Sequence, residues 1–220
     1  MSDDQEKRNI FPKWANSVPL YILIGLLLFL SFVTFVFWYW FSPKNLEVGY
    51  APKQPIPYSH QLHVSQLGMD CRYCHVNVER STAATVPATE VCMNCHNIIK
   101  KDSPHIAKLA ESFKSGKPMQ WVKVHVLPDY VYFDHSRHVG AGVSCVSCHG
   151  RIDQMKRVHQ VEPLSMSWCL DCHRAPEKHL RPKKFVTKLD WKADDQLKMG
   201  LLLKAEHHIN PGESCSVCHR

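Results

Sequence analysis

Five copies of the pattern Cys-x-x-Cys-His constrain this 220-residue chain more than any other feature of its sequence. They occupy residues 71–75, 92–96, 145–149, 169–173 and 215–219, and are called the first to fifth motifs below. The chain has ten cysteines, and all ten belong to a motif. Any fold for this sequence must therefore arrange five units that each carry two thiols and one imidazole.

Disulfide frameworks and zinc sites are the usual interpretations of clustered cysteines, but neither requires a histidine after every second cysteine. Covalent haem attachment does: two cysteines three positions apart bond one porphyrin, and the adjacent imidazole binds its iron. The pattern therefore predicts five covalently attached haem c groups. The predicted attachment residues are Cys71, Cys74, Cys92, Cys95, Cys145, Cys148, Cys169, Cys172, Cys215 and Cys218. The predicted proximal iron ligands are His75, His96, His149, His173 and His219.

An uncharged segment at residues 18–41 is long enough to cross about 30 Å of hydrocarbon as a helix. Aromatic residues lie near both of its ends, and three basic residues precede it. Because c-type haem is attached on the outer side of an energy-transducing membrane, the haem-bearing part is expected there. A cleaved signal peptide is the alternative, but it would have a shorter apolar region and small residues at a cleavage site. We expect a single-pass signal anchor in the cytoplasmic (inner) membrane, with the haem domain on the periplasmic side.

These features predict four regions. Residues 1–16 form a cytoplasmic tail, 17–42 a transmembrane signal-anchor helix, 43–57 a proline-containing linker, and 58–220 a pentahaem cytochrome c domain. The haem domain contains a repeat, in which His60-x-x-His63 precedes the first motif and His135-x-x-His138 precedes the third. An aromatic residue lies two positions before each pair (Tyr58 and Phe133). We expect dihaem modules at 58–100 and 130–175, with a fifth haem at 207–220.

The fold class expected is a multihaem cytochrome c, with mostly short α-helices and loops wrapped around five haems and one N-terminal transmembrane helix. The porphyrins would supply most of the apolar core. Short helices are expected at the motifs. Longer helices are predicted at 103–115, where Ser103 is a suitable N-cap and Pro104 suits the first turn, and at 190–206.

Ten histidines remain as candidate distal ligands after the five proximal ones. His60, His63, His135 and His138 are favoured because residues i and i+3 share a helix face, so that one turn can serve two haems. The leading histidine of each pair is expected to bind the haem of the next motif, and the trailing one the second haem of its module. His125, in an apolar segment, is ranked first as the fifth distal ligand. The alternatives left open are His207, His208, His159, Met155 and Met166, whereas His105 and His179 are expected at the surface.

The formal charge of +7 would suggest an anionic partner. Five haems, however, would add about ten propionate charges and about five positive ferric centres, which leaves a net charge of roughly +2. The basic residues are therefore expected to neutralise propionates, and no nucleic-acid partner is predicted.

The aromatic-x-His-x-x-His segment before a haem motif resembles the class III-like multihaem cytochromes c. The whole chain is similar to the pentahaem cytochrome c subunit of bacterial alternative complex III, a quinol:electron-acceptor oxidoreductase. This resemblance rests on the single anchor, the five motifs and the stretches at 124–150 and 164–174. It implies as partners polytopic quinol-site subunits, an iron–sulfur protein and monohaem cytochromes c.

Two functions fit these features. The first is an electron-transfer subunit relaying electrons through five c-type haems within such a complex, with no catalytic residues of its own. The alternative is a self-contained membrane-anchored multihaem quinol dehydrogenase feeding periplasmic reductases. That class carries a methionine close behind the first motif, whereas His75 is followed here by Val76, Asn77 and Val78. The sequence favours the first function.

Overall fold

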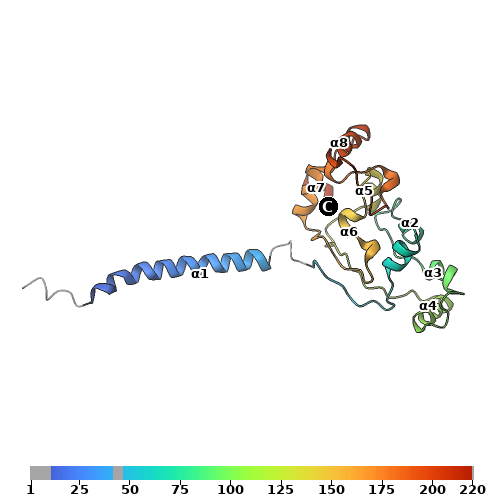
Figure 1. Ribbon diagram of the computed structural model, residues 1–220, viewed down its shortest axis with the longest axis horizontal. Helices are drawn as coiled ribbons and strands as arrows, with labels where there is room; N and C mark the ends of the chain where they lie inside the picture. Colours follow the sequence, from blue (N-terminus) through green and yellow to red (C-terminus); the bar gives the residue numbers. More distant parts are fainter. Residues whose placement is uncertain (1–10, 42–46, 220) are drawn as a thin grey trace, which may run out of the picture. The chain divides into compact units, whose positions relative to one another are not determined.

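The computed structural model describes residues 11–41 and 47–219. Most of the predicted cytoplasmic tail, the start of the predicted linker and Arg220 lie outside these residues. The chain divides into two compact units, Met1–Leu46 and Glu47–Arg220, each described by itself below (Figure 1).

The first unit consists of a short 3₁₀-helix, η2 (Lys13–Ser17), that continues into the long helix α1 (Val18–Trp40). None of the described side chains of α1 is buried, and the helix contains no charged residue. An apolar surface on every side is typical of a helix that lies in lipid rather than one half-buried in a protein. With its first turn from Lys13, the helix is long and apolar enough to cross a membrane, as the sequence predicted.

The second unit is built from short helices and loops, and the residues described contain no β-strand. Two isolated antiparallel bridges, one between Val131 and His219 and one between Val143 and Leu180, are the strand-like pairings in the described range. Its helices are η3 (Gln61–Gln66), α2 (Cys71–Cys74), α3 (Thr89–His96), α4 (Pro104–Ser115), α5 (His135–Ala141), α6 (Val146–His149), η4 (Ile152–Gln154), α7 (Met166–Arg174), η5 (Pro176–Lys178), η6 (Lys183–Phe185), α8 (Gln196–Glu206) and α9 (Cys215–Cys218). The expected fold class is confirmed.

The two longer helices test the capping signals in the sequence. Helix α4 begins at Pro104, with the Ser103 side chain accepting a hydrogen bond from the His105 backbone, and it ends before Gly116 at φ +68°. That prediction is confirmed. The helix predicted from residue 190 begins only at Gln196, because the Asp195 carboxylate accepts a hydrogen bond from the Lys198 backbone and caps the helix there.

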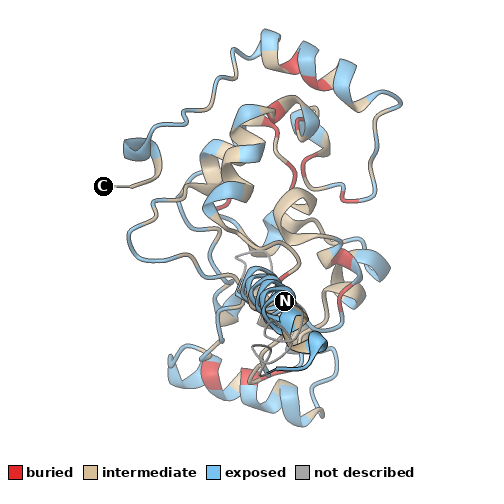
Figure 2. Cartoon of the chain, turned by 90° about the vertical axis from the view of Figure 1, so that its left-hand side faces the viewer, coloured by how far each residue is buried: buried red, intermediate tan, exposed pale blue. Residues whose placement is uncertain are grey.

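The polypeptide itself provides only a small apolar core. Among the described residues, the buried apolar side chains are Ile56, Val78, Leu109, Met155, Leu180, Val186, Leu189 and Leu203. Figure 2 shows that the buried residues as a whole are scattered over several segments rather than gathered in one centre. A unit of this size would normally bury a much larger share of its side chains. This small core fits the expectation that a large apolar group completes the interior.

The predicted linker contributes to the second unit. Gly49 donates a backbone hydrogen bond to the Gln160 carbonyl (2.7 Å), and Gln160 donates one to the Tyr50 carbonyl (3.1 Å). The Arg157 side chain also reaches the Pro52 carbonyl (3.2 Å). Residues 47–57 are therefore packed against the segment around residue 160, although they contain no helix or strand.

Candidate haem sites

Each of the five motifs lies on a short helix or at its ends, with Cys145 as the N-cap of α6 and His75 and His219 as the C-caps of α2 and α9. A helical turn brings two cysteines three residues apart onto one face. The first motif shows how the sequence starts such a helix. The Asp70 carboxylate accepts a hydrogen bond from the Arg72 backbone (2.9 Å) and so caps α2. Ser165 caps α7, which carries the fourth motif, by accepting from the Trp168 backbone (3.4 Å).

The histidine that ends each motif has its Nδ1 atom engaged. Four of them lie within hydrogen-bonding distance of a backbone carbonyl: His75 with Thr85 (2.6 Å), His96 with Ile99 (3.0 Å), His173 with Gly212 (2.7 Å) and His219 with Tyr130 (3.1 Å). Because a carbonyl only accepts, Nδ1 carries the proton and Nε2 keeps a free lone pair. This is the tautomer that a metal ligand needs. Sequence inspection could not find these acceptors, since every residue has a carbonyl.

Histidines far apart in the sequence face each other across a fixed gap. The ring centroids of His63 and His96 lie 6.3 Å apart, those of His138 and His173 6.2 Å, and those of His135 and His149 6.5 Å. Metal–nitrogen bonds of about 2 Å, plus about 1 Å from each nitrogen to its ring centre, place two opposite imidazoles about 6 Å apart. Each pair therefore leaves room for one iron atom, and the residues present fit a haem with two histidine ligands.

The aromatic residue before each histidine pair holds the pair in place. Tyr58 stacks on His63 (4.4 Å between centroids) and meets His60 edge-on (4.9 Å). Phe133 does the same with His138 (4.6 Å) and His135 (4.7 Å). The repeat seen in the sequence is thus also a repeat of side-chain geometry.

The trailing histidines are also oriented alike. The Nδ1 atom of His63 lies 2.9 Å from the Ser59 carbonyl, and that of His138 lies 2.8 Å from the Asp134 carbonyl. In both cases the acceptor is four residues earlier in the chain. In the neutral form of each ring, Nδ1 therefore carries the proton and Nε2 keeps the free lone pair, as for the motif histidines.

The leading histidines differ in their partners. The Nδ1 atom of His135 lies 2.8 Å from the Thr82 carbonyl, whereas the buried Nδ1 atom of His60 has no hydrogen-bond partner. Burial, together with the nearby imidazoles of His75 and His63, lowers the pKa of His60 to about 4. The ring is therefore neutral near pH 7 and able to bind a metal through a nitrogen lone pair.

His125, the predicted fifth distal ligand, contacts a motif histidine directly. Its Nε2 atom lies 3.3 Å from Nδ1 of His149, and the ring centroids are 4.3 Å apart. This gap is too short for an iron atom, so these two rings are not opposite ligands of one haem. Burial, followed by the imidazoles of His125 and His135, lowers the pKa of His149 to about 3. The assignment of His125 as fifth distal ligand stays a prediction.

The alternative fifth ligands lie in different surroundings. His207 and His208 are exposed just after α8, and Met166 is exposed at the start of α7, whereas Met155 is buried and His159 half-buried. His105 is exposed on α4, as expected for a surface residue, and His179 is half-buried. No disulfide joins any of the ten cysteines, all of which lie in the described part of the chain.

The cysteine side chains of the first, third and fourth motifs lie close to one another. Burial, then the Cys172 and Cys169 thiols, raises the pKa of Cys148 to about 12. The interaction between the Cys71 and Cys145 thiols raises the pKa of Cys145 and lowers that of Cys71. The first motif therefore lies beside the third, and the third beside the fourth.

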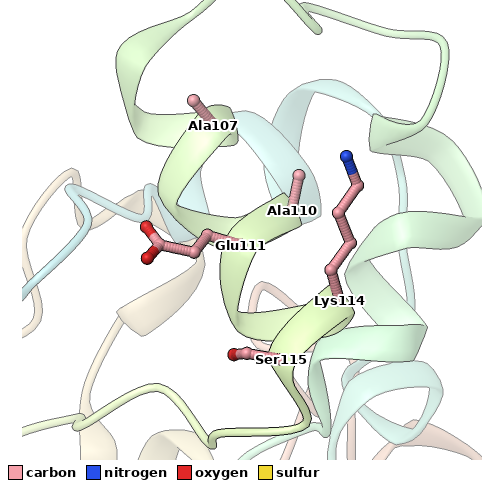
Figure 3. Close-up of a pocket in the computed structure, with 5 residues that line it drawn as sticks. All are labelled: Ala107, Ala110, Glu111, Lys114 and Ser115. Carbon is pink, nitrogen blue, oxygen red and sulfur yellow. The ribbon is translucent and has the colours of Figure 1, made fainter.

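A shallow hollow on α4 is formed by Ala107, Ala110, Glu111, Lys114 and Ser115 (Figure 3). All five side chains come from one helix, and none is a histidine or cysteine. The described residues also contain no cluster of three or more histidine, cysteine or acidic side chains placed to hold a metal ion. The arrangement that stands out is instead the set of paired imidazoles beside the motifs.

Comparison with known proteins agrees with this arrangement. The family described as cytochrome c7 and related cytochrome c matches residues 56–112. The chain is 30% identical over 197 residues to the multihaem cytochrome c subunit of a menaquinone reductase from Nitratidesulfovibrio vulgaris, and the match covers 86% of each protein. This protein belongs to the multihaem cytochrome c family, whose members bind haem c covalently.

Proposed function

We propose that the chain carries five covalently bound haem c groups and relays electrons as a subunit of a membrane quinol:acceptor oxidoreductase. The observation that carries this proposal is the set of histidine pairs separated by 6.2–6.5 Å, each including a motif histidine. Two imidazoles on one iron favour electron transfer, because they leave no open position for a substrate.

The roles proposed for the residues follow from this. The ten motif cysteines hold the porphyrins, and His75, His96, His149, His173 and His219 are the proximal ligands. His60, His63, His135, His138 and His125 are the distal ligands. Bound haem supplies the one-electron couple, and the chain fixes the orientation of the imidazoles through their Nδ1 contacts. Tyr58 and Phe133 act as positioning residues, because each packs against both histidines of its pair.

The proposed complex is alternative complex III. Support comes from the similarity to a multihaem cytochrome c subunit of a menaquinone reductase, since that relative is named as part of a quinone-linked enzyme. The proposed partners are polytopic quinol-site subunits, an iron–sulfur protein and monohaem cytochromes c. The chain itself is proposed to be an electron carrier, because one membrane helix offers little from which to build a quinol pocket.

We also propose that α1 is an uncleaved anchor in the cytoplasmic membrane, with its N-terminus inside and the haem domain, residues 58–220, on the periplasmic side. Lys13 lies at the N-terminal end of the apolar segment, as expected for the cytoplasmic end. The modules at 58–100 and 130–175 and the fifth site at 207–220 complete the proposed organisation.

Purification of the full-length protein from its native membrane in a mild detergent tests this function. We expect it to elute with polytopic subunits, and we expect its intact mass to correspond to five attached haems. A matched variant, Cys215→Ala/Cys218→Ala, should lose the mass of one haem. A chain that elutes alone and oxidises quinol unaided would refute the proposal and support the self-contained quinol dehydrogenase.

A further inference from the structure

The first and second motifs are neighbours in space. The Asn94 side chain, from the second motif, donates a hydrogen bond to the Tyr73 hydroxyl in the first motif (3.2 Å). His63, which precedes the first motif, faces His96 of the second motif at 6.3 Å. A further side-chain contact of α3, between Thr89 and Ser112 (3.1 Å), ties this helix to α4. These contacts place the second motif beside the first.

The first and third motifs are held together by one dipeptide later in the chain. The Val186 carbonyl accepts a hydrogen bond from the hydroxyl of Ser144, the residue before the third motif (2.6 Å). The Thr187 hydroxyl donates one to Asp70, the residue before the first motif (2.8 Å). The Cys71 and Cys145 thiols of these two motifs also lie near each other.

A second contact joins the same two sites. The backbone of His135 donates to the Thr82 carbonyl (3.1 Å), and the backbone of Ser136 donates to the Ser81 carbonyl (3.2 Å). Residues 81–82 lie between the first and second motifs, whereas His135 faces His149 of the third motif at 6.5 Å. The two modules therefore meet through the leading site of each.

The fourth motif connects the third to the fifth. His138, from the pair that also supplies His135, faces His173 of the fourth motif at 6.2 Å. His173 in turn lies 2.7 Å from the Gly212 carbonyl, and Arg174 forms an ion pair with Glu213 (3.3 Å), just before the fifth motif. In Figure 1, α3 and α4 lie at one end of the second unit, away from α7 and the C-terminal residues.

The solvent exposure of the motifs differs along this series of contacts. Cys95 and Cys215 are the two exposed cysteines, and they belong to the second and fifth motifs. In the third motif, by contrast, no residue is exposed. The motifs at the two ends of the row of contacts are thus the ones with an exposed cysteine, and the one in its middle has no exposed residue.

We propose that the five haem sites form one unbranched row in the order second, first, third, fourth, fifth, and that partner proteins exchange electrons with the chain at the second and fifth sites. This deepens the proposed function and rests on it. Each transfer moves one electron, so that one iron is oxidised and its neighbour reduced, with no atom transferred. The electrons come from quinol oxidised in a partner subunit and leave to a monohaem cytochrome c.

Redox coupling between individual haems tests this order in the intact holoprotein. The charge of one iron shifts the potential of another by an amount that falls with distance and is screened beyond about 10 Å. The variant His63→Met should raise the potential of the second haem, because methionine ligation favours the reduced state. We expect the next largest shift at the first haem. The variant His138→Met should shift the third and fifth haems more than the first and second. His105→Met, on the exposed face of α4, should shift none.

Potentials would be assigned haem by haem with NMR during a redox titration. A larger shift at the third, fourth or fifth haem than at the first in His63→Met would overturn the order. If either variant fails to fold, pairwise magnetic coupling in the wild-type protein gives the same ranking by pulsed EPR. Five attached haems and copurifying partners with a different coupling pattern would refute the row alone. A different haem count would refute the proposed function instead.

Discussion

The Nε2 atom of His125 lies 3.3 Å from the Nδ1 atom of His149, and the two imidazole planes cross at 86°. His149 is thereby distinguished from the other four motif histidines, whose Nδ1 atoms all face backbone carbonyls. When Nδ1 of His149 carries the proton, it can donate a hydrogen bond to the lone pair on Nε2 of His125. The contact therefore gives His125 a second possible role, which is to orient the iron ligand His149, in addition to the proposed role as a distal ligand itself.

The variant His125→Ala separates these roles. If His125 is a distal ligand, its removal leaves one haem iron five-coordinate. We then expect one of the five haems to become high-spin. The ferric EPR spectrum and the visible absorption bands of the purified protein measure this. Five low-spin haems with a single shifted potential would contradict the ligand role and assign His125 to the contact with His149.

Replacing His138 with alanine should also convert one haem from low-spin to high-spin. The reason is geometric, since His138 is the imidazole that faces His173 at 6.2 Å. Resonance Raman spectra report the spin state directly. His105→Ala is the control, because His105 is exposed on α4, and its spectrum should match that of the wild-type protein. A fully low-spin His138→Ala protein would show that the pair does not share an iron.

The packing of α8 depends on a glycine. A Cβ atom on Gly200 would overlap the backbone carbonyl of Glu177 in η5, so Gly200→Ala must push the helix away. We expect a loss of about 1–3 kcal/mol in the free energy of unfolding. Thermal denaturation would show it as a melting temperature several degrees lower. Lys198→Ala, exposed on the same helix, should stay within about 0.5 kcal/mol of the wild-type value.

Acid stability should depend on Asp70. Hydrogen bonds from the Arg72 side chain, and further ones from the Arg72 backbone and Thr187, lower the pKa of Asp70 to about 2. Because the pKa of an unfolded aspartate is about 3.9, this stabilisation is present above about pH 4 and is lost as the pH falls toward 2.

The variant Asp70→Asn should therefore be less stable than the wild-type protein at pH 7, and the difference should shrink between pH 4 and 2. Chemical denaturation at a series of pH values measures this. Asp102→Asn, an exposed carboxylate in the turn before α4, serves as the control. A difference that stays constant down to pH 2 would mean that the Asp70 charge does not contribute.

Part of this arrangement could be predicted because it follows from the spacing of residues in the sequence. The sequence contains two i, i+3 histidine pairs, and an aromatic residue precedes each pair. In the structure, Tyr58 and Phe133 pack against the histidine rings of their own pairs. The helix at Pro104–Ser115 was predictable for a similar reason, since its start and end are marked by Ser103 and Gly116.

Other features have no comparable signature. The acceptors at Thr85, Gly212 and Tyr130 are backbone carbonyls, and the link between the first and third motifs comes from loop residues around Val186. The late start of α8 was missed because the acidic run before it offers more than one cap, and only tertiary packing selects Asp195.

The Val186–Thr187 contacts have a consequence for how the protein is made. Ser144 and Asp70 emerge from the ribosome well before the dipeptide that joins them. The first and third motifs therefore lack these contacts until residues 186–187 have been synthesised. Folding of the first and third sites therefore cannot be completed module by module from the N-terminus.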